Sequence, residues 1–109
     1  MDRMTLREVC AHAGVTRRAV QGYEEAGLVY RSGKNERGYL LYDTYAFERI
    51  EQIKLYQQFG FTIREIQTII DAPNPVLKQA LEEKVLCMKQ EEERFQALIE
   101  KANELISRL

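Results

Sequence analysis

Apolar residues recur along the chain at spacings that predict five helices, with a short hairpin between the second and the third. The first helix is predicted over residues 6–13, because four apolar residues there share one helical face: Leu6, Val9, Cys10 and Ala13. Thr5 can cap its start, since Glu8 follows three residues later as in a capping box. Gly14 is a natural end, because glycine takes the left-handed conformation without a side-chain clash.

The second helix is predicted from about Thr16, whose hydroxyl can cap it, to Ala26. Its inner face comprises Val15, Ala19, Val20 and Tyr23. Two helices joined by a turn of about three residues that contains Gly14 form the helix-turn-helix pattern. Arg17 and Arg18 follow the cap directly, which is where a recognition helix presents side chains to DNA.

A hairpin is predicted next, with strands at residues 29–30 and 39–42. The loop between them is polar, contains Gly33 and Gly38, and carries the basic residues Arg31, Lys34 and Arg37. In isolation, a solvated surface hairpin would be the simpler interpretation. Beside a recognition helix we favour a wing, whose basic tip and aromatic residues such as Tyr39 contact the sugar-phosphate backbone.

A second helix pair follows the hairpin. The helix at residues 44–59 is apolar around much of its circumference, so we expect it to be mostly buried. Thr62 and Glu65 form a capping box for the next helix. Pro73 and Pro75 cannot continue a helix, so the sequence predicts a winged helix-turn-helix domain over residues 1–72 and a linker over residues 73–75.

Residues 76–109 contain neither Gly nor Pro and carry an apolar seam with alternating spacings of four and three: Leu81, Val85, Met88, Glu92, Phe95, Ile99, Ala102, Ile106 and Leu109. This dimerisation helix would be roughly 50 Å long. We expect a second copy to cover the seam, and the alternative is that the helix folds back along its own domain. Glu92 interrupts the seam, either as a polar layer that sets register or as a surface glutamate.

The distribution of charge along the chain supports a DNA-binding helix-turn-helix, whereas the net charge of the whole chain does not. The chain has a net charge of −1, but residues 1–42 hold seven Arg and Lys against five Asp and Glu. No apolar run is long enough to span a membrane, and there is no apolar signal region, so we expect a cytoplasmic protein. An enzyme is not expected, because His12 is the only histidine and no motif pairs a nucleophile with a base.

Four segments together resemble the signature of the MerR family of transcriptional regulators. They are Val15–Thr16, Tyr23–Val29, Arg37–Tyr42 and Phe59–Ile66, in that order and followed by a long helix. The resemblance implies a mainly α fold with a small two-stranded wing, a second helix pair and an antiparallel coiled coil. It also implies a homodimer that binds a pseudo-palindromic operator in double-stranded promoter DNA and distorts it, with RNA polymerase as a further candidate partner.

The resemblance carries over to individual residues at the recognition helix and the wing. Thr16, Arg17 and Arg18 match DNA-contacting positions. Tyr23 matches an aromatic residue that touches the phosphate backbone while closing the core, and Tyr39 matches the wing tyrosine. Gln21 and Leu40 stand where the family usually has arginine, and Gly22 where it has an aromatic residue or histidine. These departures leave open a dimeric protein-interaction adaptor with weakened DNA binding.

Many relatives carry an effector domain after the coiled coil, so the chain resembles either a short member or one cut before that domain. Metal-sensing relatives place a cysteine at the start of the dimerisation helix and further cysteines after it. Cys87 lies about three turns into this helix, and no second ligand follows it. Two such thiolates could bind a metal only if they approached each other across a dimer. We therefore expect no metal site and no cofactor, and we expect Cys10 and Cys87 to be reduced thiols.

Overall fold

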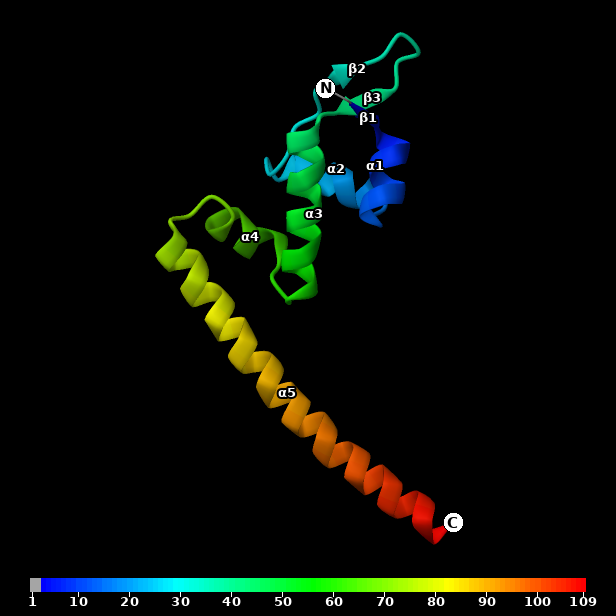
Figure 1. Cartoon of the computed structure of the whole chain (residues 1–109), viewed down its shortest axis with the longest axis vertical. Helices are drawn as coiled ribbons and strands as arrows, with labels where there is room; N and C mark the ends of the chain where they lie inside the picture. Colours follow the sequence, from blue (N-terminus) through cyan, green and yellow to red (C-terminus); the bar gives the residue numbers. More distant parts are fainter. Residues whose placement is uncertain (1–2) are drawn as a thin grey trace. The chain divides into compact units, whose positions relative to one another are not determined.

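The computed structural model describes residues 3–109, which are mainly helical. The elements, in chain order, are β1 (Met4–Thr5), α1 (Leu6–Ala13), α2 (Arg17–Glu25), β2 (Gly33–Lys34), β3 (Leu40–Tyr42), α3 (Thr44–Gln58), α4 (Ile63–Ile69) and α5 (Asn74–Arg108). Figure 1 shows their arrangement along the chain. The chain divides into two compact units between Asp71 and Ala72. The first unit holds the helix-turn-helix, the sheet and the α3–α4 pair, and the second consists of α5.

The helix starts are set by side-chain caps that the sequence predicts. Thr5 and Glu8 form the capping box of α1, and Thr62 and Glu65 form that of α4. The Thr16 hydroxyl accepts a hydrogen bond from the Ala19 amide at 3.0 Å, so α2 begins where expected. Gly14 ends α1 with φ of +68°, which confirms its role as the left-handed residue of the turn.

The sheet differs from the predicted two-stranded hairpin. It has three strands in the order β1-β3-β2, all antiparallel, with Thr5 opposite Leu41 and Lys34 opposite Leu40. The prediction of a strand at residues 29–30 was wrong, because Val29 is buried in the core as part of a loop. The first hairpin strand is β2, inside the predicted loop, and its short Gly-Lys sequence gives no alternating pattern.

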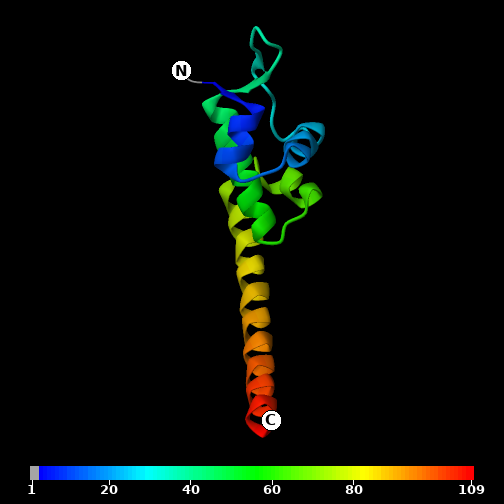
Figure 2. The ribbon, with the colours of Figure 1, turned by 90° about the vertical axis from the view of Figure 1, so that its right-hand side faces the viewer.

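The core of the first unit joins the helices to the sheet. Its fully buried residues come from α1, α2, β3, α3 and α4, and the largest are Tyr42, Ile50, Ile53, Ile66, Val9 and Val20. The expectation that α3 is mostly buried was only partly right. Tyr45 and Leu55 are exposed, so α3 buries one face and presents the other to solvent. Helix α2 and the hairpin both belong to the first compact unit, whose ribbon Figure 2 shows from a second side.

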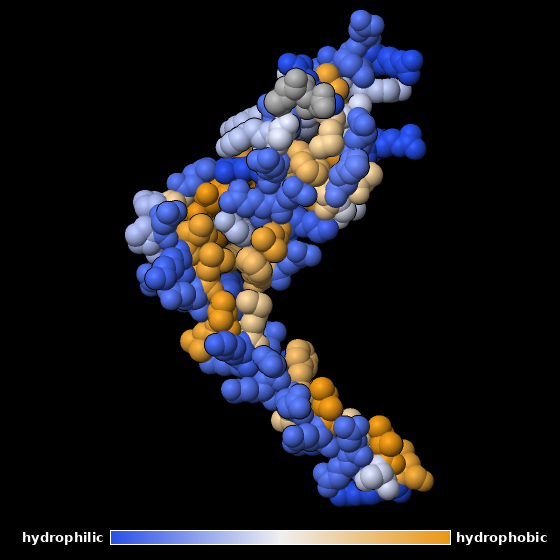
Figure 3. All heavy atoms as spheres, viewed as in Figure 1, coloured by the Kyte–Doolittle hydropathy of each residue, from blue (hydrophilic) through white to orange (hydrophobic). Residues whose placement is uncertain are grey.

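Helix α5 begins at Asn74, so Asn74 and Pro75 form its first turn instead of a linker. Proline is tolerated there because the first-turn amides have no helical partners. None of the α5 residues is buried. Exposed apolar side chains recur along the helix, as Figure 3 shows: Val76, Val85, Leu86, Met88, Phe95, Leu98, Ile99, Leu105 and Ile106. What covers the apolar residues of α5 stays a prediction, with a second copy expected and fold-back along the chain's own domain as the alternative.

Candidate nucleic-acid interface

The N-terminal part of α2 presents an exposed polar and basic surface. Thr16, Arg17, Arg18 and Gln21 are all exposed. Neither arginine has an ion pair with a carboxylate of the described residues. The apolar side of the same helix packs into the core through Val20 and Tyr23. The helix is therefore held by one face while its free cations point to solvent, as a recognition helix requires.

Tyr23 belongs to the core and not to the exposed surface. Its side chain is 2% exposed, and its hydroxyl donates a 2.6 Å hydrogen bond to Oε1 of Gln57 on α3. Burial raises the pKa of Tyr23, which keeps the phenol protonated. The phosphate contact of this tyrosine stays a prediction, and in the DNA-free chain its hydroxyl anchors α2 to α3.

Arg31 is engaged at the base of the hairpin. Its Nε donates to Oε2 of Glu24 at 2.9 Å, while Oε1 of Glu24 accepts from the Tyr42 hydroxyl at 2.9 Å. Burial and this hydrogen bond raise the pKa of Tyr42, and the hydrogen bond to Glu24 raises the pKa of Arg31. Glu24 therefore joins the end of α2 to β3 and to the start of the hairpin through Arg31, whose contact with DNA stays a prediction.

The tip of the wing is ordered by Asn35. Its Oδ1 accepts hydrogen bonds from the amides of Arg37 at 2.9 Å and Tyr39 at 3.0 Å. Such a side-chain-to-backbone turn is characteristic of asparagine. Lys34, Arg37 and Tyr39 stay exposed around it. The sequence analysis did not identify Asn35 as a turn residue. The available signal was an asparagine in a polar loop, because its side chain can accept from the amide two residues later.

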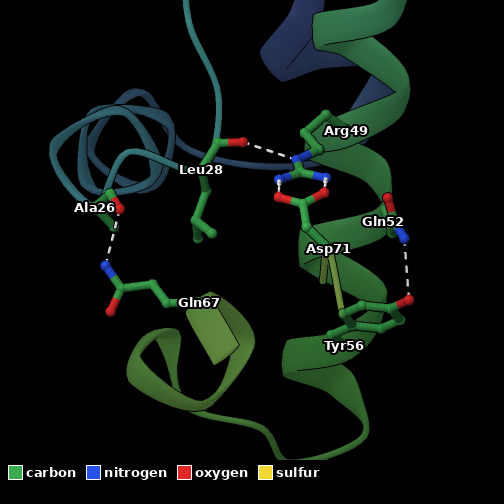
Figure 4. Close-up of polar contacts among 7 residues, drawn as sticks. All are labelled: Ala26, Leu28, Arg49, Gln52, Tyr56, Gln67 and Asp71. Carbon is green, nitrogen blue, oxygen red and sulfur yellow. Dashed lines mark hydrogen bonds and ion pairs between the residues drawn. The ribbon is translucent and has the colours of Figure 1, made fainter. Parts of the chain in front are cut away.

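The other end of α2 is held by α3 and α4, as Figure 4 shows. The Arg49 guanidinium donates to the Leu28 carbonyl at 2.8 Å and to both Asp71 oxygens, at 2.8 and 2.7 Å. Gln67 donates from Nε2 to the Ala26 carbonyl at 2.8 Å. We call Arg49, Asp71 and Gln67 the exit clamp, because they fix the backbone where it leaves the recognition helix.

The exit clamp gives a pH dependence of stability with a definite sign. The bidentate hydrogen bond from Arg49 lowers the pKa of Asp71 below its ordinary value of 3.8. A lowered folded-state pKa means that the pair stabilises the fold at neutral pH and loses its effect as pH falls through the pKa of the folded state. We expect Asp71→Asn to lower the urea midpoint at pH 7, and we expect the difference from the parent to shrink below about pH 4. A difference that does not change with pH would contradict this role.

Gly22 offers a substitution with a gain in stability. It is helical, and a Cβ built there meets nothing within 4 Å. We expect Gly22→Ala to raise the free energy of unfolding by about 0.5–1 kcal/mol in urea titrations. Gly14→Ala is the matched control and should destabilise, because Gly14 has φ of +68° and its Cβ would lie 2.7 Å from Nζ of Lys54. A loss of stability in Gly22→Ala would contradict the open geometry.

The comparisons with known proteins agree with this geometry. Residues 4–73 match the family of MerR HTH family regulatory proteins, and this match spans the helix-turn-helix, the wing and the α3–α4 pair. The chain belongs to the MerR family. The family resemblance of the four sequence segments is thereby confirmed.

Individual MerR-family proteins match the chain over different lengths. It is 28% identical over 95 residues to the transcriptional activator Mta of Bacillus subtilis, a match that covers 87% of this chain and 37% of Mta. It is 32% identical over 69 residues to nodulation protein NolA of a Bradyrhizobium strain, covering 63% of this chain and 29% of NolA. The chain thus spans about a third of these curated relatives.

Solved MerR-family structures share the fold. A regulator from Bacillus cereus superposes with a TM-score of 0.76 at 25% identity, covering 94% of this chain and 79% of the other. The N-terminal part of Mta from Bacillus subtilis gives 0.70 at 26% identity, covering 94% and 97%. HiNmlR, a MerR-family regulator lacking the sensor domain and bound to promoter DNA, gives 0.71 at 18% identity, covering 91% and 86%. This last likeness concerns the fold alone.

Two further properties concern the described residues 3–109. No helix among them has the length and apolar character needed to cross a membrane. No three His, Cys, Asp or Glu side chains among them are grouped so that they could hold a metal ion. Cys10 is half-buried on α1, where burial raises its thiol pKa, and Cys87 is exposed on α5.

Proposed function

We propose that this MerR-family chain is a dimeric, sequence-specific DNA-binding regulator of transcription. The observation that carries the proposal is the pair of unpaired, exposed arginines, Arg17 and Arg18, at the start of a helix whose other face is anchored in the core. Side chains at this end of a recognition helix reach base edges in the major groove. Family membership adds a separate line of support.

The proposed DNA-contacting surface combines α2 with the wing. Its members are Thr16, Arg17, Arg18, Gln21, Lys34, Arg37 and Tyr39, all of them exposed. Arg17 and Arg18 are assigned to base edges. Lys34, Arg37 and Tyr39 are assigned to phosphates, because they are exposed cations and a phenol on a wing tip whose backbone Asn35 holds in place. Tyr23 and Arg31 support this surface from behind through their contacts with Gln57 and Glu24.

A homodimer is proposed from the exposed seam of α5. Apolar side chains repeat along it at heptad spacing, and a soluble chain that exposes such a continuous strip has a partner surface. A second copy of α5 matches it in length and pattern, and an antiparallel pair would place two helix-turn-helix units at opposite ends. Two identical units favour an operator with two related half-sites. Distortion of a promoter operator and an effect on RNA polymerase rest on family membership.

The test is binding of the purified protein to a pool of random-sequence duplex DNA at two salt concentrations. We expect affinity to fall as salt rises, because each cation that contacts a phosphate releases a counterion. The double variant Arg17→Ala/Arg18→Ala should bind more weakly at both concentrations while melting at the same temperature as the parent.

Absence of DNA binding by a folded, dimeric protein would contradict the proposal. It would favour the adaptor alternative, in which the fold is retained for protein interactions. Gln21 and Leu40, which supply no cation, would then explain the loss of affinity.

A further inference from the structure

A groove runs between the start of α1, the start of α2 and the wing. Its volume is about 380 Å³, and its lining residues are Thr5, Leu6, Arg7, Arg17, Gly38, Tyr39 and Leu40. Three separate segments thus meet at one concave surface, and the groove adjoins the proposed DNA-contacting surface through Arg17 and Tyr39.

The groove is electropositive. Arg7 and Arg17 both line it, and neither has an ion pair with a carboxylate among residues 3–109. None of its lining residues is acidic. The nearest carboxylate in sequence, that of Glu8, is held by Thr5, because its Oε1 accepts from the Thr5 amide at 2.9 Å and the Thr5 hydroxyl at 3.1 Å. Two uncompensated cations in one hollow favour an anion there.

The chemistry of the lining points to one kind of anion. Tyr39 adds an exposed phenol that can donate a hydrogen bond, and Leu40 adds an apolar wall without a donor. The wing therefore brings no cation to this groove, and the second positive charge comes from α1. A phosphodiester fits this set, because it carries one negative charge on two oxygens and adjoins a sugar whose C–H groups can pack against Leu40.

We propose that Arg7 binds a backbone phosphate of the operator in this groove together with Tyr39, next to Arg17, which is assigned to a base edge. This inference rests on the proposed function and extends the DNA-contacting surface to α1, where the sequence pattern indicated no contact. Arg7 acts as a phosphate-binding residue that sets the register of the wing on the duplex and carries no base preference.

The experiment measures the salt dependence of binding to a duplex enriched by repeated selection from a random-sequence pool. We expect Arg7→Gln to lower the slope of log affinity against log salt by about one per protomer. Relative to the parent, Arg7→Gln should lose more affinity at low salt than at high salt. Arg7→Lys should keep the slope, because it retains the charge. The exposed position of Arg7 predicts an unchanged melting temperature for both variants.

A charge relocation makes the test sharper. In Arg7→Gln/Leu40→Arg the cation returns to the same groove from the wing, so the slope lost in Arg7→Gln should be restored. Lys101→Gln on α5 changes the net charge equally and should leave the slope as in the parent.

Three results would overturn the inference in distinguishable ways. If the parent and Arg7→Gln bind the selected duplex with the same slope of log affinity against log salt, Arg7 contacts no phosphate. If Lys101→Gln lowers the slope as much as Arg7→Gln does, the effect comes from net charge and the groove has no role. If the parent itself enriches no duplex, the proposed function fails, and the phosphate site fails with it.

Discussion

Replacing Ile99 by glutamate is expected to convert the dimer into monomers and to abolish tight operator binding. Ile99 is exposed on the isolated chain and lies on the seam of α5. In a symmetric dimer the substitution places two carboxylates in an apolar interface, and each unpaired buried charge costs several kcal/mol. A monomer contacts one half-site only. It therefore loses the increase in affinity that a dimer gains by binding two half-sites at once. Sedimentation velocity and operator titration measure the two effects.

Ala97→Glu is the matched control, because it adds the same charge to the same helix at a position opposite the seam. This variant should stay dimeric and bind the operator as the parent does. A dimeric Ile99→Glu protein with parental affinity would contradict the proposed interface. A monomeric Ala97→Glu protein would show that the interface lies on another face of α5.

Arg17→Ala is expected to weaken operator binding by roughly 1–3 kcal/mol and to relax the preference at one base position of each half-site. Arg17 is exposed and follows the Thr16 cap, so the helix itself should remain intact. Binding to a series of duplexes with single base changes measures the change in preference.

Lys34→Ala on the wing is the contrasting variant for Arg17→Ala. A phosphate-contacting lysine should weaken binding to all duplexes by a similar factor and reduce the salt slope. An Arg17→Ala profile that also falls uniformly across the series would remove Arg17 from the base-reading role.

The helical part of the fold could be predicted from short-range chemistry. Thr5, Thr16 and Thr62 cap helices through hydrogen bonds within three residues, and Gly14 needs only its own backbone freedom. These signals are local, so a single sequence reveals them. The heptad spacing of α5 is equally local, although its partner surface lies outside the chain.

The sheet and the supporting contacts could not be predicted in the same way. Strand β1 has two residues and forms only because Thr5 pairs with Leu41, far along the chain. Burial of Tyr23 and capture of Arg31 depend on Gln57 and Glu24, whose positions follow from the packing of α2 on α3 and β3. Residue type predicts DNA contacts for these two side chains, whereas their hydrogen bonds with Gln57 and Glu24 follow only from tertiary structure.

The basic groove illustrates the same limit within the candidate site. Arg7 and Arg17 are ten positions apart, and Tyr39 lies on the wing, so no spacing rule joins them. They meet because the turn at Gly14 folds α2 against α1 and the β1–β3 pairing brings the wing to the start of α1. The DNA-contacting residues of α2 follow a motif, whereas those contributed by α1 emerge only from the fold.

Operator binding by a dimer is tested most sharply by the sequences of the duplexes that the parent protein selects from a random pool. We expect an inverted repeat whose two half-sites are bound by one dimer, with enrichment that is lost in Arg17→Ala/Arg18→Ala. Selection of no common sequence by a folded protein, or enrichment that survives the loss of both arginines, would contradict this expectation.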